Sequence, residues 1–292
     1  MSVSEVAFAV MDLLDRRRSD LAFRFLTAYL EHTGDYAGMA LIRFYLVYRA
    51  MVRAKVAAIR RAQFSPGKAG SHLFDEYRDY VRLATSLAGS SRPALVIMSG
   101  PSGSGKTTCS QALVEALGAV RVRTDVERKR LHGLAIAAGS TSPLEGGLYS
   151  PAETERTYQA VSAAASRTAT AGFTAIVDGS FLKRSQRDLL RRLGSDLRIP
   201  VVIVSCTGAP ATLRARVSER LHRGGDASEA DLAVLEHQLS TVEPLTADEL
   251  QQAVVWDADQ PAGAMRQAVV DAINRRLNLD ATDRRLNLES FT

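Results

Sequence analysis

The feature that most constrains the fold of this chain is the run Gly100-Pro101-Ser102-Gly103-Ser104-Gly105-Lys106-Thr107, which matches G-x-x-x-x-G-K-[ST] in full. It follows the apolar segment Ala94-Leu95-Val96-Ile97-Met98 and precedes a predicted helix at 105–117, so strand, loop and helix occur in the order that the motif requires. Glycines let such a loop turn its backbone N–H groups onto phosphate oxygens, and the helix N-terminus adds partial positive charge. The sequence therefore predicts a phosphate-binding loop that takes a nucleoside triphosphate.

Individual side chains of this loop have expected tasks. Lys106 would reach the β- and γ-phosphates, and the Thr107 hydroxyl would bind Mg²⁺. A chance Gly/Ser turn before a helix is the alternative, which the order of the three elements disfavours. The residues expected to bind the nucleotide in this loop are Gly100, Ser102, Gly103, Ser104, Gly105, Lys106, Thr107 and Thr108.

Composition describes an ordinary globular chain of 292 residues, 46% hydrophobic and 24% charged, which is enough for one large domain or two small ones. The start, Met1-Ser2-Val3-Ser4-Glu5, lacks the pattern of a signal peptide, and no segment approaches the roughly 20 apolar residues of a membrane span. We therefore expect a cytoplasmic protein that has no contact with the membrane.

The metal-binding residue types are sparse. Cys109 and Cys206 are the only cysteines, and one falls in a predicted helix and the other at the end of a predicted strand, so we expect buried packing residues. The five histidines are scattered without a ligand spacing. We expect neither a zinc nor an iron site.

The formal net charge of +5 would suit a polyanionic partner. Arginines in a nucleotide enzyme also serve the phosphates themselves, and no basic run is interleaved with aromatic residues as in a single-strand-binding surface. A nucleic-acid partner is therefore an alternative that we do not favour.

Residues 1–88 form a predicted helical N-terminal segment. Apolar residues recur at helical spacing over 3–63, with helix breaks near Ser19-Asp20 and Thr33-Gly34-Asp35. Residues 63–71 are predicted as a linker and 72–87 as a fourth helix, and a second linker at 89–93 leads into the strand before the phosphate loop.

From residue 93 onward the pattern alternates strand and helix, which is typical of an α/β fold with a parallel sheet covered on both faces. This predicts one domain over 93–276, followed by a tail at 277–292. The predicted strands are 94–99, 119–123, 174–178, 200–206 and 252–256. The predicted helices are 105–117, 125–133, 152–171, 182–196, 209–222, 228–240 and 261–276.

Asp125 follows the second predicted strand, and Arg128 lies about one turn further along a helix. Ligands of open parallel sheets sit at the carboxyl ends of the strands, so Asp125 is placed to face the γ-phosphate. There its carboxylate could accept the proton of an attacking hydroxyl, while Arg128 could hold the acceptor or the transferring phosphoryl group. A simple N-cap role for Asp125 is the alternative, and the two roles are compatible.

Asp178 ends the third predicted strand and is followed by Gly179. An acid at this position holds Mg²⁺ through water in phosphate-loop enzymes, so Asp178 and Thr107 are the expected metal residues. A glutamate directly after the acid would favour activation of water, and its absence favours transfer to a bound acceptor. Ser180 is either a site residue or an ordinary turn residue.

Arginines recur on the predicted helix that ends at Gly224-Gly225. Arg216 and Arg220 share one face, and Arg223 lies a turn beyond. We expect Arg216 and Arg223 to bind the nucleotide and Arg220 to act in catalysis, on a lid that closes over the phosphates with the glycines as hinge. A solvated basic helix face is the alternative.

Residues 139–151 are predicted as a long loop without regular structure, which often marks a substrate loop. Tyr149 and residues 153–156 are candidate acceptor contacts. A plain surface loop would have the same sequence character.

With these features in hand, residues 93–276 resemble the phosphate-loop kinase superfamily that includes polynucleotide 5′-kinases, gluconate and adenylylsulfate kinases and zeta toxins. The shared features are the loop 100–107, Asp125-x-x-Arg128, the strand ending at Asp178 and the arginine-bearing lid. The resemblance implies a P-loop NTPase fold with five parallel strands in the order 2-3-1-4-5, ATP as the donor, and Asp125 as the base.

The whole chain is also similar to the C-terminal part of bacterial fusions of an aminoglycoside-phosphotransferase-like lobe with an ATP-binding domain. The segments that carry this similarity are 35–38, 44–50, 53–56, 124–131 and 226–231. In those fusions the helices matching 3–63 close the phosphotransferase lobe, but its His-x-Asp-x-x-x-x-Asn catalytic loop is absent here. The resemblance thus implies a catalytically silent remnant or docking element at 1–88, which could meet a protein partner.

Together these features predict an ATP- and Mg²⁺-dependent kinase that moves the γ-phosphoryl group to a hydroxyl of a small molecule or sugar. Its catalytic residues would be Lys106, Asp125, Arg128 and Arg220. A nucleic-acid 5′-hydroxyl kinase is the first alternative. The second is a nucleotide-sensing module in which ATP alters how the N-terminal helices dock on a partner.

Overall fold

A computed structural model describes residues 2–63, 68–89, 91–138, 146–223 and 228–277. Its centre is a five-stranded parallel sheet with strand order β2-β3-β1-β4-β5. The strands are β1 (Leu95–Ser99), β2 (Val120–Arg123), β3 (Ala175–Asp178), β4 (Val201–Thr207) and β5 (Ala253–Asp257). Each begins and ends within one residue of its predicted bounds, and the order 2-3-1-4-5 is confirmed.

The central strand fixes the register of the sheet. Every residue of β1 is buried, and Leu95 pairs with Ala175 of β3 on one side and with Val201 of β4 on the other. A continuous apolar strand of this kind is stable where both faces of a parallel sheet are covered. All five strands therefore end at the same edge, which is where a ligand site of such a fold is expected.

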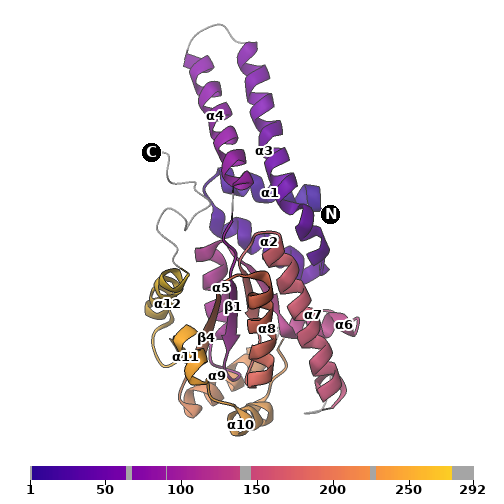
Figure 1. Cartoon of the computed structure of the whole chain (residues 1–292), viewed down its shortest axis with the longest axis vertical. Coiled ribbons are helices and arrows are strands. Elements are labelled where there is room, and N and C mark those ends of the chain that lie inside the picture. The colour runs from indigo at the N-terminus through magenta and orange to yellow at the C-terminus, as the bar shows by residue number, and fades with distance from the viewer. Residues whose placement is uncertain (1, 64–67, 90, 139–145, 224–227, 278–292) are drawn as a thin grey trace.

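Helices cover both faces of the sheet. Figure 1 shows α5 (Lys106–Leu117) and α12 (Ala262–Arg276) on one side and α7 (Pro151–Thr170) and α8 (Arg184–Leu197) on the other. The remaining helices of the α/β part are α6 (Thr124–Leu131), α9 (Pro210–Arg223), α10 (Leu232–Thr241), α11 (Ala247–Gln252) and the short 3₁₀ helix η2 (Gly147–Tyr149).

The N-terminal segment is helical, as predicted. It consists of α1 (Val3–Asp15), α2 (Ser19–Thr33), the 3₁₀ helix η1 (Tyr36–Gly38), α3 (Met39–Ala62) and α4 (Lys68–Ala88). Gly34 ends α2 in the left-handed conformation with φ 71°. The helices α3 and α4 pack side by side and project away from the sheet (Figure 1). The predicted breaks near 19 and 34 are confirmed.

The N-terminal helices share one hydrophobic core with the sheet. Phe23 of α2 meets Phe173, just before β3, edge to face at 6.1 Å between ring centroids. Arg43 of α3 donates to the carbonyl of Gly172 at 3.1 Å. Because these contacts bury apolar area of both parts together, removing residues 2–63 would expose the face of α5 and β2 that α2 covers.

Three helix predictions need correction. α4 begins at Lys68, so part of the predicted linker at 63–71 is helical, while residues 64–67 lie outside the described residues. The predicted helix at 228–240 begins only at Leu232, because Asp231 caps it by accepting from the Val234 amide at 2.8 Å. The short helix α11 was not predicted, since six residues are too few for a periodic signal.

In the described part of the chain, no helix combines the length and the hydropathy that crossing a bilayer would require.

Candidate active site at the carboxyl edge of the sheet

The phosphate loop lies between β1 and α5 and has the backbone that its glycines allow. Gly100, Gly103 and Gly105 have φ of 148°, 80° and 83°, a region that residues with a side chain rarely adopt. At Gly100 space is also lacking, because a Cβ there would lie 2.2 Å from the carbonyl oxygen of Cys206. The loop therefore depends on glycine both for its conformation and for its approach to β4.

A cleft of about 630 Å³ opens beside this loop at the carboxyl edge of the sheet. Of the residues predicted from the sequence for the site, it is lined by Ser102, Lys106, Thr107, Asp125, Arg128, Asp178 and Arg220. Tyr149 and Thr154, predicted acceptor contacts, and the candidate Ser180 line it as well. The structure thus gathers residues from five separated segments around one cavity.

Lys106 begins α5 and folds back over the loop. Its Nζ donates to the carbonyl of Pro101 at 2.8 Å. Burial lowers the pKa of Lys106, and the nearby carboxylate of Asp178 opposes this effect. A buried ammonium group lacks hydration by water, so an anionic ligand stabilises its charged form strongly. Phosphate groups would therefore bind Lys106 well.

Asp178 ends β3 with its side chain buried and directed at the start of α5. Its Oδ2 accepts from Ser110 Oγ at 3.0 Å and lies 4.0 Å from Nε of Arg123. The Thr107 hydroxyl lines the same cleft. A carboxylate and a hydroxyl are oxygen ligands of the kind that Mg²⁺ prefers, so these two residues fit a magnesium ion bound with phosphates.

A buried chain of polar contacts connects Asp178 to the N-terminal segment. Ser110, which bonds Asp178, also accepts from Nη1 of Arg121 at 3.3 Å. Arg121 of β2 is in turn paired with Glu31 of α2 at 2.9 Å, with side chains 7% and 13% exposed. Hydrogen bonds and ion pairs that are shielded from water are strong because the local dielectric constant is low, and they fix the orientation of the side chains involved. The helix α2 therefore supports the predicted metal residue from behind.

Asp125 lies in the first turn of α6 and faces the cleft. The helix begins one residue earlier, at Thr124, and Arg123 occupies the N-cap position, so the alternative of Asp125 as the N-cap is wrong. Arg130, on the same helix, donates to the carbonyl of His32 at the end of α2 at 3.4 Å. The end of α2 thus fixes the helix that carries Asp125.

Arg128, one turn beyond Asp125, is 7% exposed and lines the cleft. Its Nη1 donates to the carbonyl of Leu148 at 2.7 Å, and its guanidinium lies over the ring of Tyr149 at 4.9 Å. Burial raises the pKa of Tyr149 to about 12, so its phenol is neutral and able to donate at neutral pH. The two residues form one wall of the cleft.

The arginines of α9 have different surroundings. Arg220 lines the cleft, and its Nη2 donates to the carbonyl of Ala230. Arg216 donates to the carbonyl of Ala258 at 2.6 Å and lies beside Gly105, outside the lining of this cleft. Arg223 is 74% exposed and pairs with Glu219 at 2.7 Å. The structure thus brings Arg220 to the site and leaves Arg223 in solvent, and the predicted hinge at 224–225 lies outside the described residues.

Comparison with known proteins places this arrangement in a family. A model of the AAA domain family (AAA_33) matches residues 95–245, which is more than half of the chain. The chain belongs to this family.

The curated relatives of this AAA domain protein are longer than it is. An uncharacterized protein of Mycobacterium tuberculosis and one of Mycobacterium bovis are each 30% identical over 263 residues, covering 87% of this chain and 52% of the relative. The chain thus spans about half the length of the curated relatives it matches.

Two solved structures share the fold, and a third is similar over part of the chain. A putative kinase from Chloroflexus aurantiacus covers 63% of this chain and 98% of its own, with 20% identity and a TM-score of 0.50. Kti12 from Chaetomium thermophilum, in complex with ADP-AlF3, covers the same shares at 17% identity and a TM-score of 0.50. A sugar kinase from Janibacter covers 66% of this chain and 98% of its own at 24% identity and a TM-score of 0.47.

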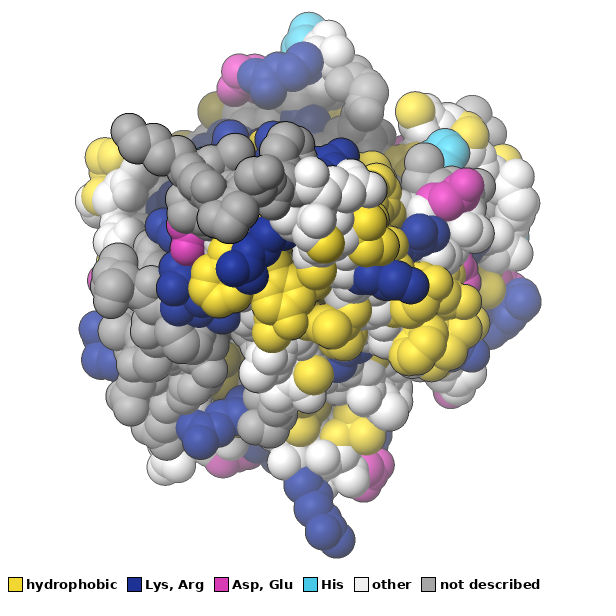
Figure 2. Space-filling view, turned by 90° about the horizontal axis from the view of Figure 1, so that it is seen from above, with side chains coloured by type: hydrophobic (Ala, Val, Ile, Leu, Met, Phe, Trp, Pro, Cys, Tyr) yellow, Lys and Arg dark blue, Asp and Glu magenta, His cyan; other side chains and the backbone are white. Residues whose placement is uncertain are grey.

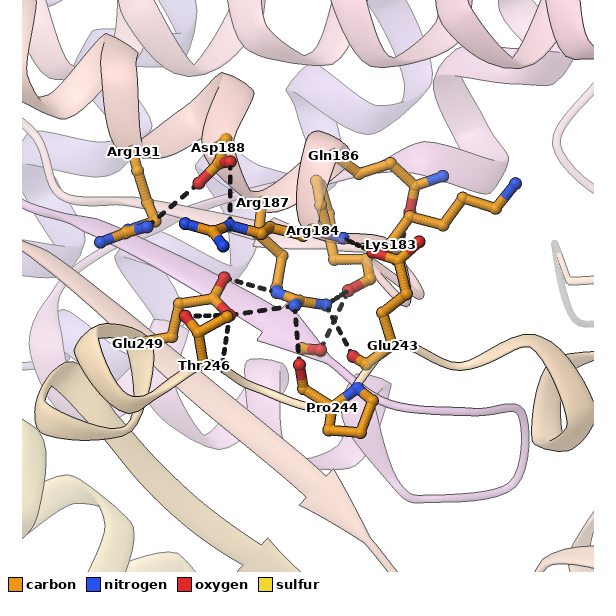
Figure 3. A network of polar contacts seen from close by, with 12 residues as sticks. Lys183, Arg184, Gln186, Arg187, Asp188, Arg191, Glu243, Pro244, Thr246 and Glu249 are labelled. Atoms are coloured by element: carbon orange, nitrogen blue, oxygen red, sulfur yellow. Dashed lines mark hydrogen bonds and ion pairs between the residues drawn. The ribbon is translucent and has the colours of Figure 1, made fainter.

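A buried ion pair joins α8 to α11 in this AAA domain. Arg187 of α8 and Glu249 of α11 are both 0% exposed and lie 2.7 Å apart. The guanidinium also donates to the carbonyls of Phe181 and Leu182, which precede α8, and to those of Glu243 and Pro244 (Figure 3). The pair therefore ties the segment after β3 to the segment after α10.

Several cleft residues were not predicted from the sequence. They are Arg123, Tyr158, Lys183, Gln186 and Gln238. Lys183 and Gln186 follow the end of β3, so their position after a strand that ends in Asp178 was an available signal. Gln238 carried no such signal, because it lies on a helix far along the chain and only the folded structure brings it to the loop.

Proposed function

We propose that this AAA domain protein is an ATP- and Mg²⁺-dependent kinase that transfers the γ-phosphoryl group of ATP to a hydroxyl of a small molecule or sugar. The observation that carries the proposal is the gathering of Lys106, Asp178 and Asp125 around one cleft of about 630 Å³. Phosphoryl transfer needs a cation that binds the phosphates, a carboxylate that binds the metal ion, and a second carboxylate nearby that acts as the base.

Each group has a role in this proposal. The amides of residues 100–108 and Lys106 bind the phosphates of ATP, and Thr107 and Asp178 hold Mg²⁺, which supplies further neutralisation of phosphate charge. Asp125 takes the proton of the acceptor hydroxyl as its oxygen bonds to the γ-phosphorus, and the bond to the β,γ-bridging oxygen breaks to release ADP. Arg220 balances the negative charge of the transferring group.

An acceptor would bind in the part of the cleft that the phosphates of ATP leave free. Besides the phosphate-loop residues, Arg128, Tyr149, Tyr158 and Lys183 line the cleft. Burial raises the pKa of Tyr158 to about 12, so both phenols are neutral donors. Hydrogen-bond donors around a cavity of this size suit a small hydroxyl compound with several oxygen acceptors.

The test is ATP consumption with Mg²⁺ across a panel of sugars, nucleosides, aminoglycosides and 5′-hydroxyl oligonucleotides. We expect one class of acceptor to stimulate turnover, and Lys106→Ala and Asp125→Asn to abolish the stimulation. ATP binding without turnover on any acceptor would contradict the proposal. If oligonucleotides are the active class, their binding should weaken steeply with salt because counterions are released.

One feature supports the second candidate, a nucleotide-sensing module. Hydrophobic side chains gather with Lys and Arg between them on the face seen in Figure 2. On α3, Leu41, Phe44, Tyr48 and Met51 are between 46% and 63% exposed and follow one another at spacings of three and four, so they share one face. Exposed apolar surface of this kind often marks a contact with another protein. Asp125→Asn that binds ATP yet loses turnover would speak against a sensing role alone.

A further inference from the structure

The backbone amide of Ser102, in the phosphate loop, is bound by a side chain from another part of the fold. It donates to Oε1 of Gln238 on α10 at 2.7 Å. Other groups at the start of the loop find partners nearby, since the Ser104 amide and hydroxyl donate to the Pro101 carbonyl at 3.3 and 2.8 Å. The partner of the Ser102 amide, Gln238, instead lies 136 positions further along the sequence. Both Ser102 and Gln238 line the cleft.

The helix α10 is packed where Gln238 can reach the loop. Leu235 of α10 forms a small hydrophobic cluster with Leu213 and Val217 of α9, separate from the main core. The loop lies directly against α9, because a Cβ on Gly103 would come within 2.6 Å of the Leu213 carbonyl oxygen. Loop, α9 and α10 therefore form one packed unit, and the contact of Gln238 with Ser102 is part of it.

The Ser102 amide belongs to the loop whose N–H groups bind phosphate in the function proposed above. The Oε1 atom of Gln238 therefore occupies the acceptor position that a phosphate oxygen would take on this amide. The carboxamide oxygen is a neutral acceptor. A phosphate oxygen carries charge, and hydrogen bonds to charged acceptors are roughly twice as strong as those between neutral groups. A phosphate that reaches the amide is therefore able to displace the carboxamide.

We propose that Gln238 is a displaceable internal ligand of the phosphate loop, which holds the Ser102 amide until a phosphate oxygen of ATP replaces it. The inference rests on the proposed function in that it takes ATP as the ligand. In this role Gln238 opposes ATP binding and stabilises the packing of α10 against the loop. Binding of ATP then breaks one contact between α10 and the loop, which couples the nucleotide to the position of this helix.

Two substitutions at one position separate this role from a merely structural one. Gln238→Met keeps the length of the side chain and removes the acceptor. We therefore expect the Kd for ATP to fall by about 2- to 10-fold, which is the change in Kd that corresponds to the free energy of one neutral hydrogen bond. Gln238→Glu keeps the shape and adds charge, so it should hold the amide more firmly, repel phosphate and raise the Kd. Gln267→Met on the exposed face of α12 is the matched control and should leave the Kd unchanged.

The fluorescence of Trp256 offers a direct readout of ATP binding. It is the single tryptophan of the chain, and its ring nitrogen lies 2.9 Å from where a Cβ on Gly105 would be. ATP would be titrated into each variant in the presence of Mg²⁺, with calorimetry as the second measurement. Gln238→Ala takes the place of Gln238→Met, with the same expected fall in Kd, if the latter does not fold.

A fall in Kd for the methionine variant together with a rise for the glutamate variant would support the inference. An unchanged or raised Kd in Gln238→Met, or a lowered Kd in Gln238→Glu, would overturn it. Because the readout is binding, its failure is separate from that of the kinase assignment. The expected shifts in a protein without acceptor-stimulated turnover would leave Gln238 as an internal ligand and remove the kinase.

Discussion

The buried ion pair of Arg187 and Glu249 makes a quantitative prediction about stability. Both side chains are 0% exposed, and two hydrogen bonds of 2.7 and 3.0 Å join them. Glu249→Ala would leave the guanidinium buried without its counter-charge, which costs about 3 to 5 kcal/mol of unfolding free energy. With a urea m-value of about 3 kcal/mol/M, the unfolding midpoint should fall by about 1 M or more.

The chain contains a matched control for this change. Arg214 and Glu236 are joined by two hydrogen bonds of the same lengths, 2.7 and 3.0 Å, but their side chains are 49% and 51% exposed. Solvent screens such a pair, so Glu236→Ala should leave the urea midpoint nearly unchanged. Unfolding would be followed by circular dichroism and by Trp256 fluorescence. Equal shifts of the midpoint in the two variants would refute the argument, because burial is the feature that distinguishes the pairs.

Three further predictions follow from the structure. Burial acts to raise the pKa of Glu249, but hydrogen bonds from Arg187 and Thr246 leave this pKa below its ordinary value of 4.5. The difference in unfolding free energy between wild type and Glu249→Gln should therefore be present above pH 4.5 and shrink as the pH falls through the pKa of Glu249 in the folded protein. Urea unfolding at several pH values checks this. Gly100→Ala should abolish ATP binding in a fluorescence titration, whereas Gly263→Ala, where a Cβ meets no atom within 4 Å, should bind ATP normally. Arg220→Ala should lower kcat far more than Arg223→Ala does, and similar losses in both would contradict their different surroundings.

Much of the fold could be predicted from local patterns. The strand before the phosphate loop is a continuous apolar run, and the loop places glycines at the positions that need positive φ, so β1 and residues 100–107 were predicted within a residue. The strand order came from a resemblance, since alternation of strand and helix gives parallel pairing without giving the order of strands. The position of Asp125 and Asp178 beside the cleft was predicted because the first follows β2 and the second ends β3, and these strands end at one edge of the sheet.

Contacts between distant segments could not be predicted in this way. Helical spacing put Arg216, Arg220 and Arg223 near one another, but the packing of α9 against the loop and α10 decides which of them faces the cleft. Gln238 and Glu31 act through partners 136 and 90 positions away. A single sequence contains no periodic signal for such pairs, because their proximity arises only when the elements pack.

In the proposed function, the γ-phosphoryl group passes to a bound hydroxyl and not to water. The most direct measurement incubates the protein with ATP labelled at the γ-phosphorus, Mg²⁺ and the stimulating acceptor, and then separates labelled acceptor from labelled inorganic phosphate. We expect label on the acceptor with the wild-type protein and none on the acceptor with Asp125→Asn. Label that appears only as inorganic phosphate, with or without acceptor, would contradict it.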